Sequence, residues 1–233
     1  MGLMKFDFEM TPTSGIAPAE AASRTDTHLV GMNGPLKRAF DIILTAPIIL
    51  FLLPALLMIA VAVKRGGGPV LYRQKRIGKD GKAFQMLKFR SMHVDADERL
   101  AQLIETCPDS AEEWACYQKL RNDPRVTRFG HLLRRSSLDE LPQLFNILRG
   151  DMSLVGQRPI MPFQRDEYGL HIRGYERARP GLTGLWQVSG RNALTFKERA
   201  AMGSDYINRW SLLLDLKILF LTIPAVLLSR DAF

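Results

Sequence analysis

A run of residues near the middle of the chain carries the side chains best suited to chemistry. It reads Arg134-Arg135-Ser136-Ser137-Leu138-Asp139-Glu140-Leu141-Pro142-Gln143-Leu144 and places two adjacent carboxylates after a pair of arginines. Proline has no N–H to donate and is tolerated in the first turn of a helix, so Pro142 predicts a helix that starts near Asp139. The positive end of a helix dipole favours an ionised carboxylate. An ionised Asp139 is suited to attack phosphorus or to bind Mg²⁺.

The same residues also have a purely structural interpretation. Ser137-Leu138-Asp139-Glu140 fits the S-x-x-E capping box, which does no more than begin a helix. With Ser137 as the cap, however, Pro142 falls where its missing N–H breaks an intrahelical bond, so the box fits imperfectly. These residues alone leave catalysis and capping both open.

The positive charge of the chain is concentrated in one stretch. The chain has 233 residues, enough for one substantial domain or a domain with an appendage, and a net charge of +8. From Lys64 to Arg90 there are nine Lys and Arg residues and one acidic residue, Asp80. The net charge of this stretch, +8, equals the net charge of the whole chain. Such a patch suits anionic lipid, a phosphate-rich small molecule or nucleic acid, or it is a solvated basic face. Cys107 and Cys116 have no histidine spacing beside them, which argues against a disulfide framework or a zinc site.

An apolar segment is the candidate membrane element. Ile42 to Val63 is 22 residues without a charge, long enough to cross a bilayer. Pro47 and Pro54 interrupt it far from its ends, and basic pairs flank both sides, Lys37-Arg38 and Lys64-Arg65. Because basic residues favour the cytoplasmic side, both ends are best placed there, which predicts a re-entrant helix-break-helix hairpin. A kinked helix that crosses the membrane once is the alternative.

The remaining segments predict an α+β fold that is mainly helical. Residues 1–33 read as a disordered tail, 34–65 as the re-entrant membrane helix and 66–233 as a cytoplasmic catalytic domain. No signal peptide is expected at the N-terminus. Strand-like runs at Pro69–Arg73 and Ala83–Phe89 predict a small β-hairpin that carries the basic patch. Val94 to Leu120 reads as an acidic amphipathic segment with a second helix starting at Pro108. Trp210 to Leu228 is apolar but broken by Asp215, Lys217 and Pro224, and with Trp210 at one end and Lys217 on a polar face it reads as an interfacial helix lying on the lipid headgroups.

Several long motifs in one order resemble a known family. They are Lys37-Arg38-Ala39-Phe40-Asp41, Leu87-Lys88-Phe89-Arg90-Ser91-Met92, Arg134 through Leu144, Gly150-Asp151-Met152-Ser153-Leu154-Val155-Gly156, Arg179-Pro180-Gly181-Leu182-Thr183-Gly184, Gly190-Arg191-Asn192 and Leu214-Asp215-Leu216-Lys217. From Lys37 to about Leu228 the chain resembles the monotopic bacterial sugar transferases. These enzymes move a sugar 1-phosphate from a nucleotide diphosphate sugar onto a polyprenyl phosphate. The loop around Trp186 is most similar to the exopolysaccharide-initiating galactose-phosphate transferases.

The resemblance implies a role for individual residues. Asp139 would be the nucleophile that takes the sugar phosphate, with Glu140 helping to hold Mg²⁺, and Pro54 would be the helix breaker, with Pro47 extra. The groups expected to bind substrate phosphates are Lys88, Arg90, Arg134, Arg158, Arg179 and Arg191. Two positions depart from the family pattern: Gln157 replaces a proline, and Gly203 stands where relatives usually carry Asp.

The resemblance also implies partners and a location. The donor would be a UDP-sugar, the acceptor undecaprenyl phosphate, and the site the cytoplasmic face of the bacterial inner membrane, against its anionic lipids. Galactose and glucose both stay open as the sugar, and a homodimer stays open as the assembly. A rival class is a membrane-anchored adaptor without enzymatic activity. A nucleic-acid binder is disfavoured, because the basic stretch has only Tyr72, Phe84 and Phe89 as aromatic residues for stacking.

Overall fold

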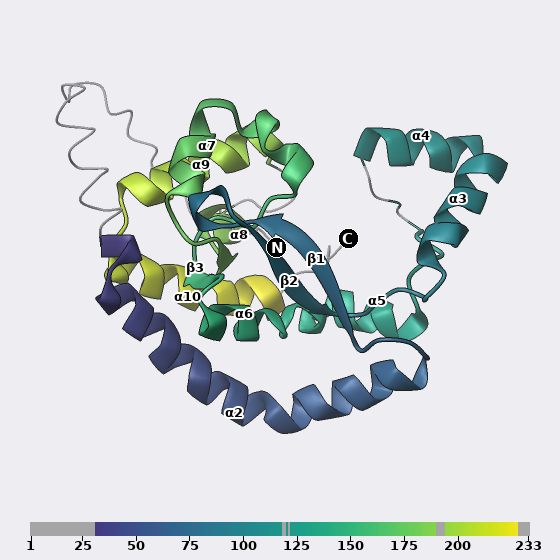
Figure 1. Cartoon of the computed structure of the whole chain (residues 1–233), viewed down its shortest axis with the longest axis horizontal. Coiled ribbons are helices and arrows are strands. Elements are labelled where there is room, and N and C mark those ends of the chain that lie inside the picture. Colours follow the sequence, from purple (N-terminus) through teal and green to yellow (C-terminus); the bar gives the residue numbers. More distant parts are fainter. Residues whose placement is uncertain (1–30, 118–119, 121, 190–193, 228–233) are drawn as a thin grey trace, which may run out of the picture. The chain divides into compact units, whose positions relative to one another are not determined.

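The computed structural model is mainly helical with two small sheets, as the sequence predicts (Figure 1). It describes residues 31–117, 120, 122–189 and 194–227. The described chain divides into two compact units. The first contains residues up to Leu50, Gln74–Met86 and Gln143–Ala225, and the second contains Phe51–Arg73, Leu87–Pro142 and the residues from Val226. Nearly all of the predicted tail, 1–33, lies outside the described residues.

The predicted membrane segment forms one helix, α2, from Pro35 to Arg65. Figure 1 draws it as an uninterrupted ribbon, so the break predicted at Pro54 is not seen in the helix. Each proline removes a single hydrogen bond, which neighbouring turns on both sides can tolerate within a continuous helix. Among the described helices α2 alone is long and apolar enough to cross a membrane, with a mean hydropathy of 2.8. Large apolar side chains on it stand exposed, Phe51 at 84% and Met58 at 68%.

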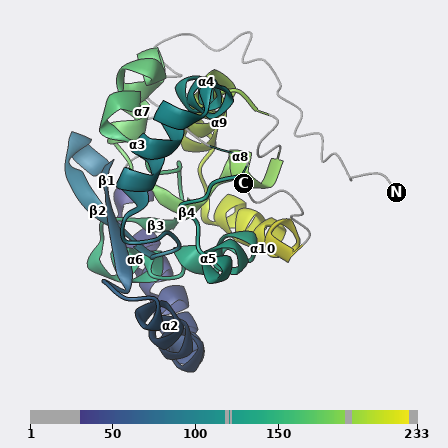
Figure 2. The same cartoon turned by 90° about the vertical axis from the view of Figure 1, so that its right-hand side faces the viewer.

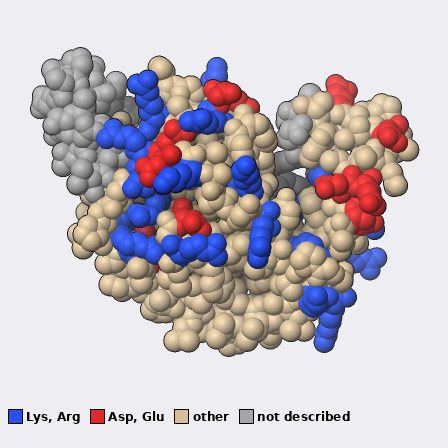
Figure 3. Space-filling view, in the orientation of Figure 1, with Lys and Arg blue, Asp and Glu red and all other residues tan. Residues whose placement is uncertain are grey.

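The predicted β-hairpin is confirmed, with a longer first strand. β1 runs over Leu71–Ile77 rather than Pro69–Arg73, and β2 over Ala83–Phe89 as expected. Between them a short turn at Lys79–Gly81 places Asp80 and Gly81 at positive φ, and the N–H of Gly78 donates to Lys82 O at 2.8 Å. Figure 3 shows Lys and Arg side chains gathered over these strands.

The second unit contains three short helices, α3 over Ala96–Thr106, α4 over Pro108–Tyr117 and α5 over Arg128–Arg135. The expected helix start at Pro108 is confirmed. α5 begins where Thr127 caps it, because the Thr127 hydroxyl accepts the N–H of Gly130 at 2.8 Å. Acidic residues lie over α3 and α4 (Figure 3), in keeping with the amphipathic acidic pattern.

The first unit contains a parallel strand pair that the sequence does not predict. β3, Ser153–Val155, pairs with β4, Gly181–Thr183, with Ser153 opposite Gly181 and Val155 opposite Thr183 (Figure 2). The backbones of Gly156 and Gly181 approach so closely that a Cβ on either would clash with the other strand. Helices surround the pair: α6 over Gln143–Arg149, α7 over Ile172–Glu176, α8 over Leu185–Ser189, α9 over Phe196–Asn208 and α10 over Leu212–Leu227.

A buried charge network ties the start of α2 to α10 in the first unit. The Lys37 ammonium lies 3.1 Å from Asp41 Oδ1 and 2.8 Å from Asp215 Oδ2. Asp41 accepts from the Ser153 hydroxyl and the Leu154 N–H. The side chain of Asp215 is fully buried, and its ion pair with Lys37 makes that burial tolerable. Burial raises the pKa of Asp215, whereas the Lys37 charge and hydrogen bonds from Tyr206 and Trp210 oppose that rise.

Candidate active site

The two adjacent carboxylates lie in a short 3₁₀ turn of the second unit, over Leu138–Glu140. The prediction that a helix begins near Asp139 is wrong by one turn, because α6 begins at Gln143, directly after Pro142. The capping box does not form either. Ser137 adopts a left-handed conformation, with φ 56°, and its side chain caps nothing. Asp139 is therefore held in a tight turn between two helices rather than at the start of one.

Lys88 from β2 lies against both carboxylates. Its Nζ is 2.7 Å from Glu140 Oε1 and 3.9 Å from Asp139 Oδ2. The three side chains are mostly shielded from water, with 19% of Lys88, 10% of Asp139 and 22% of Glu140 exposed. Shielding strengthens the attraction relative to a surface ion pair. The structure thus brings together three residues that the sequence assigns to one site.

Arg134, the arginine before the dyad, is the next charge in this group. Its Nε donates to the Ser91 hydroxyl at 2.9 Å, and Ser91 follows β2 only three residues after Lys88. Burial lowers the pKa of the Arg134 guanidinium, while the negative charges of Asp139 and Asp123 raise it. The side chain stays positive in any case, so Arg134 supplies a fixed cation within the electrostatic reach of Asp139.

A second ion pair, Asp123–Arg125, lies within electrostatic reach of Arg134, and the sequence does not predict it. Asp123 and Arg125 form a buried two-point pair, with contacts of 2.8 Å and 2.7 Å. The guanidinium of Arg125 also lies 4.7 Å from the ring centre of Trp114 in α4. No pattern in the sequence indicates a role for Asp123. Its spacing of two residues from Arg125 was the available signal, since a short turn can close such a pair.

The sequence of residues 32–229 matches the family described as bacterial sugar transferase. The match covers the helix α2, the dyad with Lys88 and Arg134, and α10. The chain belongs to the bacterial sugar transferase family.

Similar proteins with known names are also sugar transferases or exopolysaccharide production proteins. The chain is 48% identical over 196 residues to the UDP-galactose-lipid carrier transferase of Erwinia amylovora, a match that covers 84% of the chain and 41% of the relative. It is 47% identical to the exopolysaccharide production protein ExoY of Rhizobium meliloti, over 87% of the chain and 90% of that protein. It is 40% identical to the UDP-glucose:undecaprenyl-phosphate glucose-1-phosphate transferase of Escherichia coli, over 89% of the chain and 44% of the relative. The chain thus spans less than half the length of two of these relatives.

Among the other residues predicted to bind phosphate, Arg90 and Arg179 make hydrogen bonds that do not involve the Asp139–Glu140 dyad. Arg90 binds the end of α2, where its Nη2 donates to the carbonyl oxygens of Val63 and Gly67. The strand that carries Lys88 is thereby fastened to the C-terminal end of α2. In the first unit, Arg179 donates from Nε to Gly150 O at 3.0 Å, and Arg158 follows β3. Arg191 lies outside the described residues.

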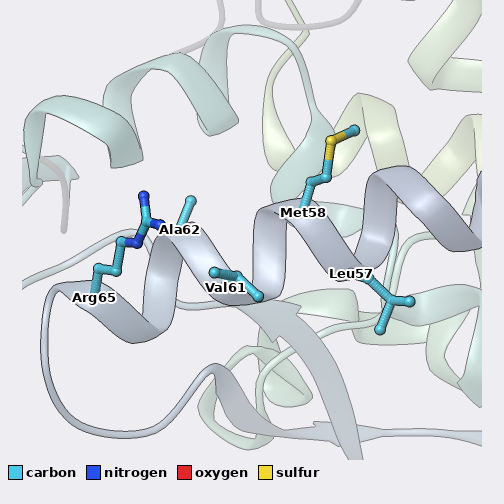
Figure 4. Close-up of a pocket in the computed structure, with 5 residues that line it drawn as sticks. All are labelled: Leu57, Met58, Val61, Ala62 and Arg65. Carbon is cyan, nitrogen blue, oxygen red and sulfur yellow. The ribbon is translucent and has the colours of Figure 1, made fainter.

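The transferase also has a shallow apolar depression on the second half of α2. It has a volume of about 390 Å³ and is lined by Leu57, Met58, Val61, Ala62 and Arg65 (Figure 4). The four uncharged residues offer no group for catalysis. Met58 and Leu57 are exposed and point to different sides of the helix in Figure 4. Apolar side chains exposed on more than one side are typical of a helix that contacts lipid or another apolar surface.

The two carboxylates of the dyad are oxygen donors of the class that Mg²⁺ takes in proteins. Within the described parts of the chain, no group of three or more His, Cys, Asp or Glu side chains could hold a metal. Mg²⁺, however, is commonly bound through one or two carboxylates together with substrate phosphates and water. Asp139 and Glu140 supply two such carboxylates side by side.

Proposed function

We propose that this transferase moves a sugar 1-phosphate from a UDP-sugar to undecaprenyl phosphate, giving a diphosphate-linked lipid sugar and UMP. This reaction would be the first membrane step of exopolysaccharide synthesis. The observation that carries the proposal is the shielded Asp139–Glu140 pair, flanked by Lys88 and Arg134, in a chain of the sugar transferase family. Relatives are named for galactose and for glucose transfer, and either sugar fits the proposal.

The proposed chemistry has two steps at one phosphorus atom. A carboxylate oxygen of Asp139 bonds to the phosphorus that carries the sugar, while the bond from that phosphorus to the bridging oxygen breaks and UMP leaves. A phosphate oxygen of undecaprenyl phosphate then attacks the same phosphorus, and the Asp139 carboxylate is released. Neither step requires a proton to be removed from the attacking oxygen. The protein's work is therefore positioning and charge stabilisation.

The basic neighbours divide this work in the proposal. Lys88 pairs more closely with Glu140 than with Asp139, and in this proposal its ammonium stays near the reacting phosphate. Arg134 offers a fork of donors within electrostatic reach of Asp139, oriented by its bond to Ser91. When bound, Mg²⁺ would neutralise the diphosphate of the donor, with Asp139 and Glu140 as its protein ligands.

The proposal is tested by nucleotide release. Detergent-solubilised protein with undecaprenyl phosphate should release UMP from UDP-galactose or UDP-glucose. An adaptor without enzymatic activity would release no UMP from any UDP-sugar, and that result would refute the proposal. RNA or DNA retention that falls with salt would instead favour a nucleic-acid binder.

Metal dependence gives a separate prediction. We expect UMP release to vanish in EDTA and to return with added Mg²⁺ or Mn²⁺, because two carboxylates beside a diphosphate form a hard oxygen site. Zinc should not restore activity to the same level. The measurement is the rate of UMP release at graded free metal concentrations, and full activity in chelator would contradict the assigned metal role.

We further propose that α2 enters and leaves the cytoplasmic face of the inner membrane as a re-entrant element. Two observations support this topology. At the start of α2, Arg38 donates to the carbonyl oxygens of Ile147 and Leu148, and at its end Arg90 holds Val63 and Gly67. Both ends thus make polar contacts with folded, charged parts of the chain, as expected if both lie on the same side.

The prolines should control this topology. Replacing Pro47 and Pro54 by Leu restores two hydrogen bonds to a helix of 31 residues, about 46 Å long, which exceeds the hydrocarbon thickness. We expect a fraction of molecules to become membrane-crossing, limited by the cost of translocating Lys37 and Arg38. A single reporter, Ser23→Cys in a background without Cys107 and Cys116, reports this by labelling from the periplasm of intact cells. Labelling already present with both prolines in place would show that α2 crosses the membrane once.

A further inference from the structure

Arg90, the residue that follows β2, holds the C-terminal end of the membrane helix. Its Nη2 donates to the carbonyl oxygens of Val63, in the last turn of α2, and of Gly67, just beyond it. Carbonyl groups at a helix C-terminus lack partners within the helix, and a cation there also meets the negative end of the helix dipole. Arg90 therefore caps α2 from a different part of the second unit.

The tip of the Arg90 side chain is turned toward protein. Nη2 has two carbonyl acceptors, and Nη1 is buried without a hydrogen-bond partner among the residues that the structure describes. Nη1 packs so closely onto Gly68 that a Cβ at this position would overlap it. A phosphate binds an arginine through the N–H groups of the guanidinium fork. Arg90 is therefore better placed to hold α2 than to bind the substrate phosphate that the sequence predicts for it.

Lys88 lies two residues before Arg90 on the same extended segment. Side chains alternate between the faces of a strand, so Lys88 and Arg90 share one face, while Leu87 and Phe89 are buried on the other. The pairing with the preceding strand continues through Arg90, whose backbone N–H donates to Val70 O at 2.9 Å. The Cα atoms of residues 88 and 90 are about 7 Å apart in such a segment. A shift of Arg90 is therefore passed to Lys88 by the strand itself.

The position of the Lys88 ammonium matters for the proposed reaction. Its Nζ lies 2.7 Å from Glu140 Oε1 and 3.9 Å from Asp139 Oδ2. Misplacing a catalytic group by about 1 Å can cost about 100-fold in rate. We propose that Arg90 is a positioning residue, which clamps the end of α2 onto β2 and thereby holds the Lys88 ammonium against the Asp139–Glu140 pair. This inference rests on the proposed function, and it gives the membrane helix a part in forming the active site.

Two adjacent glycines offer a way to disturb Arg90 without removing its charge. Gly67 and Gly68 both have positive φ, 75° and 64°, so alanine at either position meets a similar backbone strain. A Cβ at Gly67 would have no atom of the described residues within 4 Å. A Cβ at Gly68 would overlap Arg90 Nη1 and lie 2.8 Å from Val94 Cγ2. Gly68→Ala thus displaces the guanidinium, and Gly67→Ala is its matched control.

The kinetic test separates positioning from phosphate binding. We expect kcat for UMP release to fall about 10- to 100-fold in Arg90→Ala and in Gly68→Ala, with the KM values for the UDP-sugar and for undecaprenyl phosphate within about twofold of those of the unaltered protein. Gly67→Ala should keep most of kcat. Adding Arg90→Ala to Lys88→Ala should lower kcat by less than about threefold more, because Lys88 is the group that Arg90 positions.

Three kinetic results would overturn the inference. A rise in either KM with kcat retained would assign Arg90 to phosphate binding. Losses that multiply in the double variant would show that Arg90 does not act through Lys88. Equal losses of kcat in the two glycine variants would show that backbone strain, and not the displaced guanidinium, lowers the rate.

The chemical reactivity of Lys88 supplies a readout that needs no turnover. In the unaltered protein the shielded, ion-paired Lys88 should react slowly with an amine-acylating reagent, relative to the exposed Lys82, as measured by mass spectrometry of the peptides. Its acylation should accelerate in Arg90→Ala and Gly68→Ala but not in Gly67→Ala, and unchanged reactivity in the first two would overturn the inference. Absence of UMP release in the unaltered protein would instead refute the proposed function, while the acylation rates still test Arg90. Unfolding temperatures of each variant separate loss of position from loss of fold.

Discussion

Asp139→Asn should abolish turnover, with a fall in the rate of UMP release of at least about 10³-fold. The amide has nearly the same shape as the carboxylate, so the turn over Leu138–Glu140 should persist. What is lost is the negative oxygen that bonds to phosphorus, together with one ligand for Mg²⁺. Because the side chain is 10% exposed and lies beside Lys88, water cannot easily take its place as the nucleophile.

The matched control for this variant is Asp97→Asn. Asp97 lies exposed on α3 in the same unit, and its replacement by Asn removes the same charge from the chain as Asp139→Asn does. Its rate of UMP release should equal that of the unaltered protein. An Asp139→Asn protein that keeps more than about a tenth of the activity, with the control unchanged, would mean that another residue attacks the donor.

The second large effect is expected on stability, at Lys37. Lys37→Met leaves Asp41 and Asp215 buried without their cation, and breaking a buried pair by removing one partner costs about 3–5 kcal/mol. For a chain of this size, at about 2–4 °C per kcal/mol, such a loss lowers the unfolding temperature by roughly 6–20 °C. The measurement is thermal unfolding in detergent, followed by tryptophan fluorescence.

Two further variants make the stability prediction specific. Lys64→Met removes a lysine from the exposed C-terminal end of α2 and should leave the unfolding temperature nearly unchanged. The double variant Lys37→Met with Asp215→Asn removes one of the unpaired charges and should regain part of the loss. If Lys37→Met alone unfolds at the same temperature as Lys64→Met, the buried network does not hold α2 to α10.

The sequence predicts best those features that depend on neighbouring residues. Ala83–Phe89 was predicted with correct bounds because glycines mark the turn before it, and Pro108 marked the start of α4 because its ring fixes a helical φ. The dyad and Lys88 were assigned to one site only through the resemblance to a family. Their 2.7 Å contact joins residues 52 positions apart, which no local pattern encodes.

The failures arise where distant partners, very short strands or an unusual backbone conformation decide the outcome. In the sequence Asp215 is only a charge that interrupts an apolar run, and its distant partners Lys37 and Tyr206 allow it to be buried. β3 and β4 have only three residues each, so no alternating pattern can reveal them. Pro142 correctly indicated a nearby helix start, but the left-handed Ser137 and the 3₁₀ turn that follows it shifted that start to Gln143.

The most direct test of the central claim is to trap the proposed covalent intermediate. Protein mixed with UDP-galactose or UDP-glucose and Mg²⁺, without undecaprenyl phosphate, should gain the mass of one hexose phosphate, and peptide mapping should place the added mass on Asp139. Adding undecaprenyl phosphate should then remove it. An adduct on a different residue would contradict the account. So would UMP release in the presence of both donor and acceptor with no adduct detected at any time.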